Sequence, residues 1–130
     1  MGIETAIYSK LIANTAVTAL AAMRIYNTRL PQKPTYPVVV FARVSTGEDM
    51  AHDGPVGYES ARFQIDSYAA EFSTVRSLAD AVRDCLNGLS ATVEGVVVHA
   101  VMLDNEFSEW GDLLDIWRIT QDYMIYWRRT

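Results

Sequence analysis

The side chains that could support chemistry in this sequence are few and far apart. His52 lies between Asp49 and Asp53, and one imidazole with two carboxylates can bind a divalent cation weakly. The other histidine, His99, is distant in the sequence, and the single cysteine, Cys85, lies beside an apolar helical stripe. A dedicated zinc site needs several cysteine or histidine ligands close together. We therefore expect no metal site and no cofactor.

Other catalytic patterns are also missing. Asp104-Asn105-Glu106 is similar to the start of a twelve-residue calcium-binding loop. The segment lacks the central glycine of such loops, however, and has Asp115 at the twelfth position, where they carry glutamate. No dinucleotide or phosphate-loop fingerprint is present, and no serine lies in a Gly-x-Ser-x-Gly elbow. No basic cluster surrounds Cys85, which favours a small buried residue over a reactive thiol. The sequence therefore favours a structural protein over an enzyme.

The amino-acid composition further limits the class of protein to which the chain can belong. The chain has 130 residues, of which 50% are hydrophobic and 21% charged, as is typical of a soluble globular protein. We expect a single domain over residues 1–130, long enough to bury its own core. The net charge of −5 argues against sequence-independent binding of nucleic acid, which requires a basic surface. No apolar run approaches the roughly 20 residues of a membrane helix, so we expect no membrane partner.

The charges are unevenly distributed along the chain. Residues 1–45 hold five basic side chains and one acidic side chain, whereas residues 46–115 hold fourteen acidic side chains and three arginines. Such polarity suits a subunit that contacts a neighbour through faces of unlike charge. The alternative is that folding mixes these charges in space.

The elements that must position these groups follow from hydrophobic periodicity. The clearest is a strand over residues 117–127, where apolar and polar side chains alternate. Its apolar face consists of Trp117, Ile119, Tyr123, Ile125 and Trp127, with Gln121 as the polar exception. A helical stripe is equally clear before it, followed by Gly88 where a helix-ending glycine belongs. The stripe consists of Phe72, Val75, Leu78, Ala79, Val82 and Leu86.

Weaker patterns complete the fold. Residues 4–23 predict two short helices separated at Asn14-Thr15, and further strands are predicted at residues 24–27, at 38–45, from Glu59 onward and at 93–103. The order is ααβ-β-β-α-β-β. This order predicts an α+β fold, with a mainly antiparallel sheet and helices packed on one face.

Two acidic segments lie between the predicted strands. Residues 46–58 carry three glycines and no apolar periodicity, which predicts a long loop between antiparallel strands; such loops are uncommon unless they bind something. Residues 104–115 have the composition of an acidic linker. We predict that these segments contact partner proteins. The predicted interface residues are Glu48, Asp49, His52, Asp53, Glu106, Glu109 and Trp110.

Several stretches together resemble a family of small tail-completion proteins of long-tailed bacteriophages and phage-like particles. They are RIY at 24–26, LPQ at 30–32, YPVVVF at 36–41, ARFQIDSY at 61–68, VRSLADAVR at 75–83 and WRITQDYMIYW at 117–127. These are strand and helix patterns rather than catalytic motifs, but their order spans nearly the whole chain. Residues 104–115 match the family least.

The resemblance implies a structural virion protein with no catalytic residues. Such proteins form a ring, usually hexameric, that caps the tail tube and presents it to the head-tail connector or stopper protein. We then expect the chain at the tail-neck junction of a virion or phage-like particle, assembled in the cytoplasm of a bacterial host. An acidic ring would let DNA pass without binding it specifically. Two alternatives stay open, namely a head-side adaptor or stopper protein of the neck and a small α+β ligand-binding enzyme.

Overall fold

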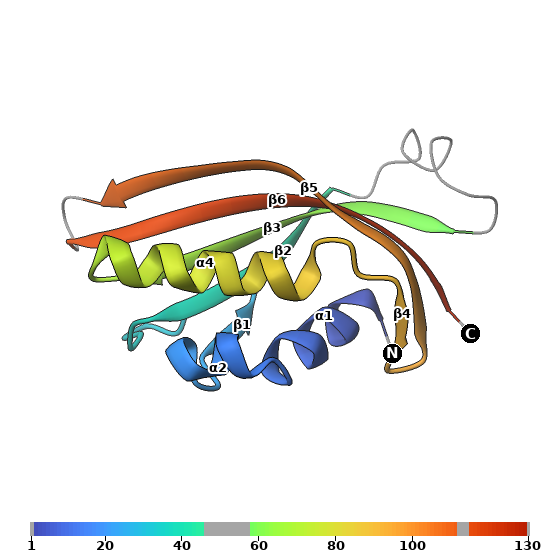
Figure 1. Ribbon diagram of the computed structural model, residues 1–130, viewed down its shortest axis with the longest axis horizontal. Helices are drawn as coiled ribbons and strands as arrows, with labels where there is room; N and C mark the ends of the chain where they lie inside the picture. The colour runs from blue at the N-terminus through green and yellow to red at the C-terminus, as the bar shows by residue number, and fades with distance from the viewer. Residues whose placement is uncertain (1, 46–57, 112–114, 130) are drawn as a thin grey trace.

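The computed structural model describes residues 2–45, 58–111 and 115–129. In these residues three helices lie on one side of a curved six-stranded sheet, which confirms the predicted α+β class (Figure 1). The helices are α1 (Ile3–Ile12), α2 (Thr15–Ala21) and α4 (Phe72–Leu86). The strands are β1 (Ile25–Asn27), β2 (Val38–Ser45), β3 (Glu59–Ala69), β4 (Ala91–Val93), β5 (Val96–Gly111) and β6 (Ile116–Arg129).

The first two helices are separated where the sequence predicts a break. The side chain of Asn14 accepts a hydrogen bond of 3.0 Å from the backbone N–H of Val17. This bond satisfies one of the amides that the first turn of α2 would otherwise leave free. The apolar face of α1 packs into the core through Ile3, Ile7 and Leu11.

Helix α4 covers the centre of the sheet with most of its predicted stripe. Val75, Leu78, Ala79, Val82 and Leu86 are buried. Phe72 is the exception, because it lies in the first turn with 43% of its surface exposed and only its ring edge packed on Trp117. Gly88 has a φ of +82° just beyond the helix, which confirms its predicted place in the helix end.

The strands lie in the order β1-β2-β3-β6-β5-β4. Strands β1 and β2 are parallel, and every other neighbouring pair is antiparallel, including the predicted pair of β2 and β3. Most of the predicted loop between β2 and β3 lies outside the described residues. Tyr58, its last residue, lies against the ring of His99, with 4.8 Å between the ring centroids.

Strand β6 occupies the middle of the sheet between β3 and β5. Ile119, Tyr123 and Ile125 have no exposed surface and Trp127 has 3%, so the predicted core face is confirmed. Trp117 is only half-buried and packs at one end of the sheet against a smaller cluster that includes Ala69, Val75, Ala79 and Ile119. The apolar alternation of β6 therefore corresponds to the face that the helices cover.

The largest difference between prediction and structure lies just before β6. The predicted strand at residues 93–103 is instead divided by a turn at Glu94 and Gly95, both with positive φ, into β4 and the much longer β5. The predicted acidic linker is wrong up to Gly111, because β5 continues through it and pairs with β6 as far as Gly111 opposite Ile116. Pairing with β6 stabilises the strand here, although its side chains show no apolar alternation.

Candidate assembly surface

Three of the predicted interface residues lie in the described part of the chain. Glu106, Glu109 and Trp110 are on the second half of β5. The four predicted residues of the loop, which are Glu48, Asp49, His52 and Asp53, lie outside the described residues. Within the described residues the candidate surface is therefore β5 and its surroundings.

One side of β5 is an open sheet edge over much of its length. Strand β4 pairs with residues 96–98 only. Next along the edge, the N–H of Gly88 donates to the carbonyl of Val101 at 2.8 Å, and the N–H of Leu103 donates to Asn87 Oδ1 at 2.9 Å. Among the described residues, no further strand or hydrogen bond lies along the outer side of residues 104–110. A free edge of this kind is a ready surface for a partner chain.

The acidic side chains of β5 are paired with arginines of the same subunit. The ion pairs are Arg62–Asp104, Arg76–Glu106 and Arg118–Glu109. Folding therefore mixes part of the charge that the sequence separates. The side chains of Asp104 and Glu109 nevertheless remain 51% and 56% exposed. Exposed pairs of this type contribute only about 0–1 kcal/mol to stability, so these carboxylates stay accessible to a neighbour.

Glu106 has a different environment from the other two acids. Its carboxylate accepts hydrogen bonds from Arg76 at 3.0 and 3.1 Å and from the amide of Gln121 at 2.8 Å. Gln121 is fully buried and also donates to the carbonyl of Ala79 at 3.1 Å. The Arg76 guanidinium lowers the pKa of Glu106. Glu106 thus holds β5 and β6 to α4. Of the three predicted interface residues that the structure describes, Glu109 and Trp110 face solvent.

We expect Glu106→Gln to lower the free energy of unfolding by about 1–3 kcal/mol at neutral pH, since the charged hydrogen bonds to Arg76 are weakened. The pKa of Glu106 is lower in the folded state than in the unfolded state. The ionised carboxylate therefore stabilises the wild type fully above the ordinary glutamate pKa of about 4.3. This contribution is lost as the pH falls through the pKa that Glu106 has in the folded protein. Urea unfolding should therefore show the gap between variant and wild type narrowing at acidic pH.

Glu109→Gln is the matched control, because the two arginine partners are almost equally exposed, whereas the Glu109 side chain is 56% exposed and that of Glu106 only 25%. This variant should change the free energy of unfolding by less than about 1 kcal/mol. A gap for Glu106→Gln that is the same at neutral and acidic pH would contradict the role assigned to its charge.

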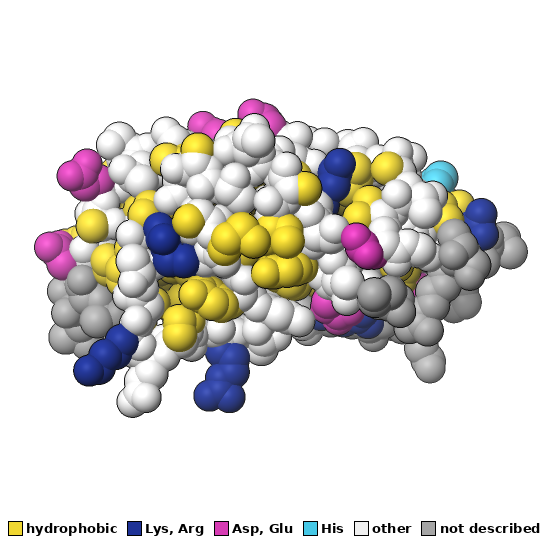
Figure 2. All heavy atoms as spheres, turned by 90° about the horizontal axis from the view of Figure 1, so that it is seen from below, with side chains coloured by type: hydrophobic (Ala, Val, Ile, Leu, Met, Phe, Trp, Pro, Cys, Tyr) yellow, Lys and Arg dark blue, Asp and Glu magenta, His cyan; other side chains and the backbone are white. Residues whose placement is uncertain are grey.

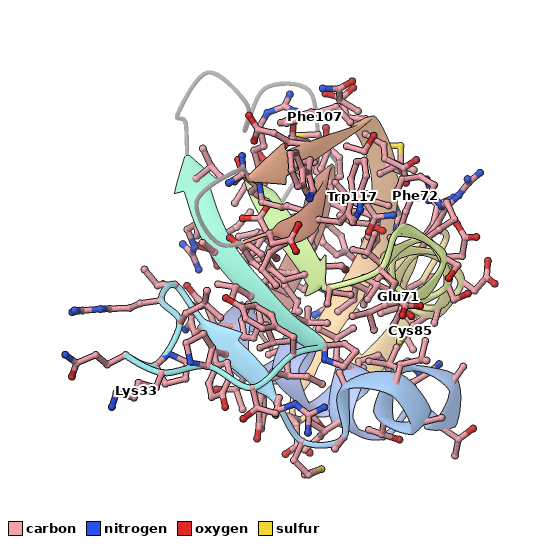
Figure 3. All side chains as sticks on the ribbon, turned by 90° about the vertical axis from the view of Figure 1, so that its left-hand side faces the viewer. Lys33, Glu71, Phe72, Cys85, Phe107 and Trp117 are labelled. Carbon is pink, nitrogen blue, oxygen red and sulfur yellow. The ribbon has the colours of Figure 1, made fainter. Side chains whose placement is uncertain are left out.

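Exposed aromatic side chains gather around the second half of β5. Phe107 and Trp110 are 46% and 45% exposed and point to opposite faces of the sheet. The Trp110 ring lies 6.2 Å from that of Trp117, which meets Phe72 edge-on at 5.0 Å. Figure 3 shows Phe72, Phe107 and Trp117 at the same end of the molecule. Aromatic residues at an open edge are typical of a surface that binds another protein.

A cleft of about 400 Å³ lies beside Trp110, between the ends of β5 and β6 and the connector from β1 to β2. Its lining includes Tyr36 of the connector, Tyr68 of β3 and the Glu109–Arg118 pair. Burial raises the pKa of Tyr68, so its hydroxyl stays protonated at neutral pH. Within the described residues the cleft holds no nucleophile beside a general base, and its aromatic walls suit an apolar side chain of a partner.

The remaining chemical candidates are not brought together. No group of three His, Cys, Asp or Glu side chains in the described ranges is arranged to hold a metal ion. Cys85 is half-buried, and burial raises the pKa of its thiol, which disfavours the reactive thiolate. Of the helices that the structure describes, none has the length and apolar character needed to cross a membrane.

Phe107 is missing from the predicted interface. Its segment has the composition of a linker, and a single aromatic residue in a linker carries no periodic signal. One signal in the sequence could have predicted a strand at Phe107. The alternating pattern of β6 is long, and a long central strand requires a partner strand of similar length on each side.

An α+β subunit with an open, aromatic sheet edge has a surface of the kind that binds other proteins. The family model of tail completion protein gp17 matches residues 5–127, and the chain belongs to this family. This confirms the resemblance seen in the sequence. As a member of this family the protein is a structural tail protein of a virion.

A solved structure shows the same fold. It is a chain from the "Virion of native gene transfer agent (GTA) particle", with 20% sequence identity and a TM-score of 0.79. The match covers 96% of the present chain and 93% of that chain. No curated protein matches the sequence.

Proposed function

We propose that this protein forms a ring, with six copies, that terminates the tail tube and joins it to the head connector. The observation that carries the proposal is the match of the tail completion family to residues 5–127 of 130. The shared fold with a chain of a gene transfer agent virion supports it. In this role the protein lies at the tail-neck junction and is assembled in the cytoplasm of a bacterial host.

The shape of the sheet supports a ring in particular. Its two sides differ, because β1 ends one side, whereas the other ends in the short β4 and, beyond it, in the open second half of β5. A subunit that joins its neighbour through two different surfaces makes heterologous contacts, which close into a ring when the rotation allows. The net charge of −5 per subunit, repeated around the ring, disfavours binding of the DNA that passes through.

The proposal predicts assembly on the tail tube. Purified protein mixed with polymerised tube protein should cap the tube ends with rings in negative-stain electron microscopy. Native mass spectrometry of the released caps should give a species of six 14.6 kDa subunits. Particles made without the protein should consist of filled heads and separate tails. A single 14.6 kDa species, both with and without tube protein, would count against the ring.

The control for this assignment uses purified heads in place of tubes. Binding to heads but not to tubes would assign the protein to the head side of the neck, as an adaptor or stopper. Binding to tubes first, followed by capture of heads, is the order that the proposed function requires.

A further inference from the structure

The sheet has two open stretches of edge, β1 on one side and the second half of β5 on the other. The register between the strands places these two stretches at the same level. Tyr26 of β1 pairs with Val40, which pairs in turn with Asp66, Thr120 and finally Phe107 of β5. Each partner lies directly across from the last in the hydrogen-bonding direction. Tyr26 and Phe107 are therefore the two ends of one row and lie at the same level along the strands.

We infer that the β5 edge of one copy, centred on Phe107, packs against the β1 edge of the next copy, centred on Tyr26. The inference rests on the proposed ring and specifies its subunit contact. Because the two edges lie at the same level, the contact needs no shift along the strands from copy to copy. A heterologous contact closes into a ring when the rotation from copy to copy also closes, and otherwise builds a filament.

The strand directions fit this contact. From β5 through β6 and β3 to β2 the strands alternate in direction, and β1 runs parallel to β2. The sheet is curved and twisted (Figure 1), so a neighbouring copy must be rotated to bring its β1 alongside β5, and β1 then runs antiparallel to β5. Antiparallel edges can pair directly, with facing side chains about 4.5–5.5 Å apart at Cβ.

The two edges also present aromatic side chains on the same face. Phe107 is nearly half exposed at the β5 edge, and Tyr26 is half-buried at the β1 edge. Both belong to the row that runs through Val40, Asp66 and Thr120, so both point to the face of the sheet opposite the helices. In the contact their rings would lie side by side, and aromatic pairs of this kind stabilise both sheets and interfaces.

Charge selects this pairing over a symmetric one. Residues 104–111 contain three acidic side chains and no basic one, whereas residues 23–33 contain Arg24, Arg29 and Lys33 and no acidic one. Lys33 projects from the molecule in Figure 3, and basic side chains project from the margin of the face in Figure 2. Asp104, Glu106 and Glu109 are paired with arginines of their own subunit, so the charge available to a neighbour is that of the exposed carboxylates of Asp104 and Glu109. These carboxylates favour the basic β1 edge over a second β5 edge.

Cross-linking between two single-cysteine variants tests the contact. In a Cys85→Ala background, Tyr26→Cys and Phe107→Cys chains are prepared separately, mixed, assembled on tail tubes and treated with a short bismaleimide. We expect covalent dimers in the mixture and none with either variant alone. A chain carrying both substitutions should give a ladder up to the complete ring.

Met102→Cys mixed with Tyr26→Cys is the matched control. Met102 lies on the same strand and is 48% exposed, but its row runs through Met124 and Arg62, away from the level of β1. This mixture should give no dimers. If Tyr26→Cys disturbs folding, as judged by circular dichroism, Asn27→Cys replaces it, because Asn27 is exposed on the same edge.

Three results would overturn the inference. Rings seen by microscopy without a cross-link between positions 26 and 107 would leave the proposed function standing but reject this contact. Cross-links between two Phe107→Cys chains would show a symmetric edge pairing instead. Failure of the protein to assemble with tubes or with itself at any concentration would reject both the contact and the ring.

Discussion

Deletion of residues 123–130 should leave the chain unfolded or insoluble. The deletion removes Tyr123, Ile125 and Trp127, whose exposed fractions are 0%, 0% and 3%. Burial of each such side chain contributes about 1.5–3 kcal/mol. The sum is comparable with the whole stability of a domain, which is about 5–15 kcal/mol. The truncation also removes the half of β6 that pairs with residues 59–63 of β3 and with residues 96–103 of β5.

Solubility and thermal melting followed by circular dichroism measure this effect. The control is Arg128→Ala, because Arg128 is exposed and its guanidinium lies over the Tyr58 ring at 5.7 Å from the centroid. Such an exposed contact contributes about 0.5–1 kcal/mol, so this variant should remain folded. A truncated chain that stays soluble and melts cooperatively would mean that the aromatic side chains of β6 serve a partner rather than the core.

Replacement of residues 46–57 by a six-residue Gly-Asn linker should keep the subunit folded and abolish the joining of tails to heads. The last pair of β2 and β3 is Ser45 opposite Arg62, and β3 begins at Glu59. The linker must therefore reach back to Tyr58, about 13 Å beyond Arg62, which six residues can span and a two-residue turn cannot. Tyr58 is retained, because its ring packs against His99 and lies beneath Arg128. The number of infectious or transducing particles should fall to that of a strain lacking the protein, while the melting curve stays close to wild type.

A second loop variant separates the effect of charge from that of length. It keeps every residue of the loop except Glu48, Asp49 and Asp53, which become Gln, Asn and Asn. If the predicted interface is electrostatic, this variant should lose most of its joining activity at physiological salt, since unlike charges steer partners together. A normal number of particles from the shortened loop would show that the loop is not an interface element.

The sequence alone determines most of the secondary structure, because a one-sided burial pattern is a local property. The stripe of α4 and the alternation of β6 are visible as periodicities of 3.6 and 2, and both elements occur where they are predicted. The break at Asn14 and the end at Gly88 are also local, since each satisfies backbone geometry at one residue. The family resemblance follows from the same patterns, because the matching stretches are these elements in their order.

Only the tertiary structure decides the second half of β5 and the surface it forms. Residues 104–111 are mostly exposed on both faces, so no burial pattern marks them as a strand, and their strand conformation comes from pairing with β6. Folding also joins Asp104 and Glu109 to arginines that are distant in sequence. The alignment of Tyr26 with Phe107 depends on the register of every strand pair between them. Register is a relation between segments far apart in the chain, and for this reason composition and periodicity do not contain it.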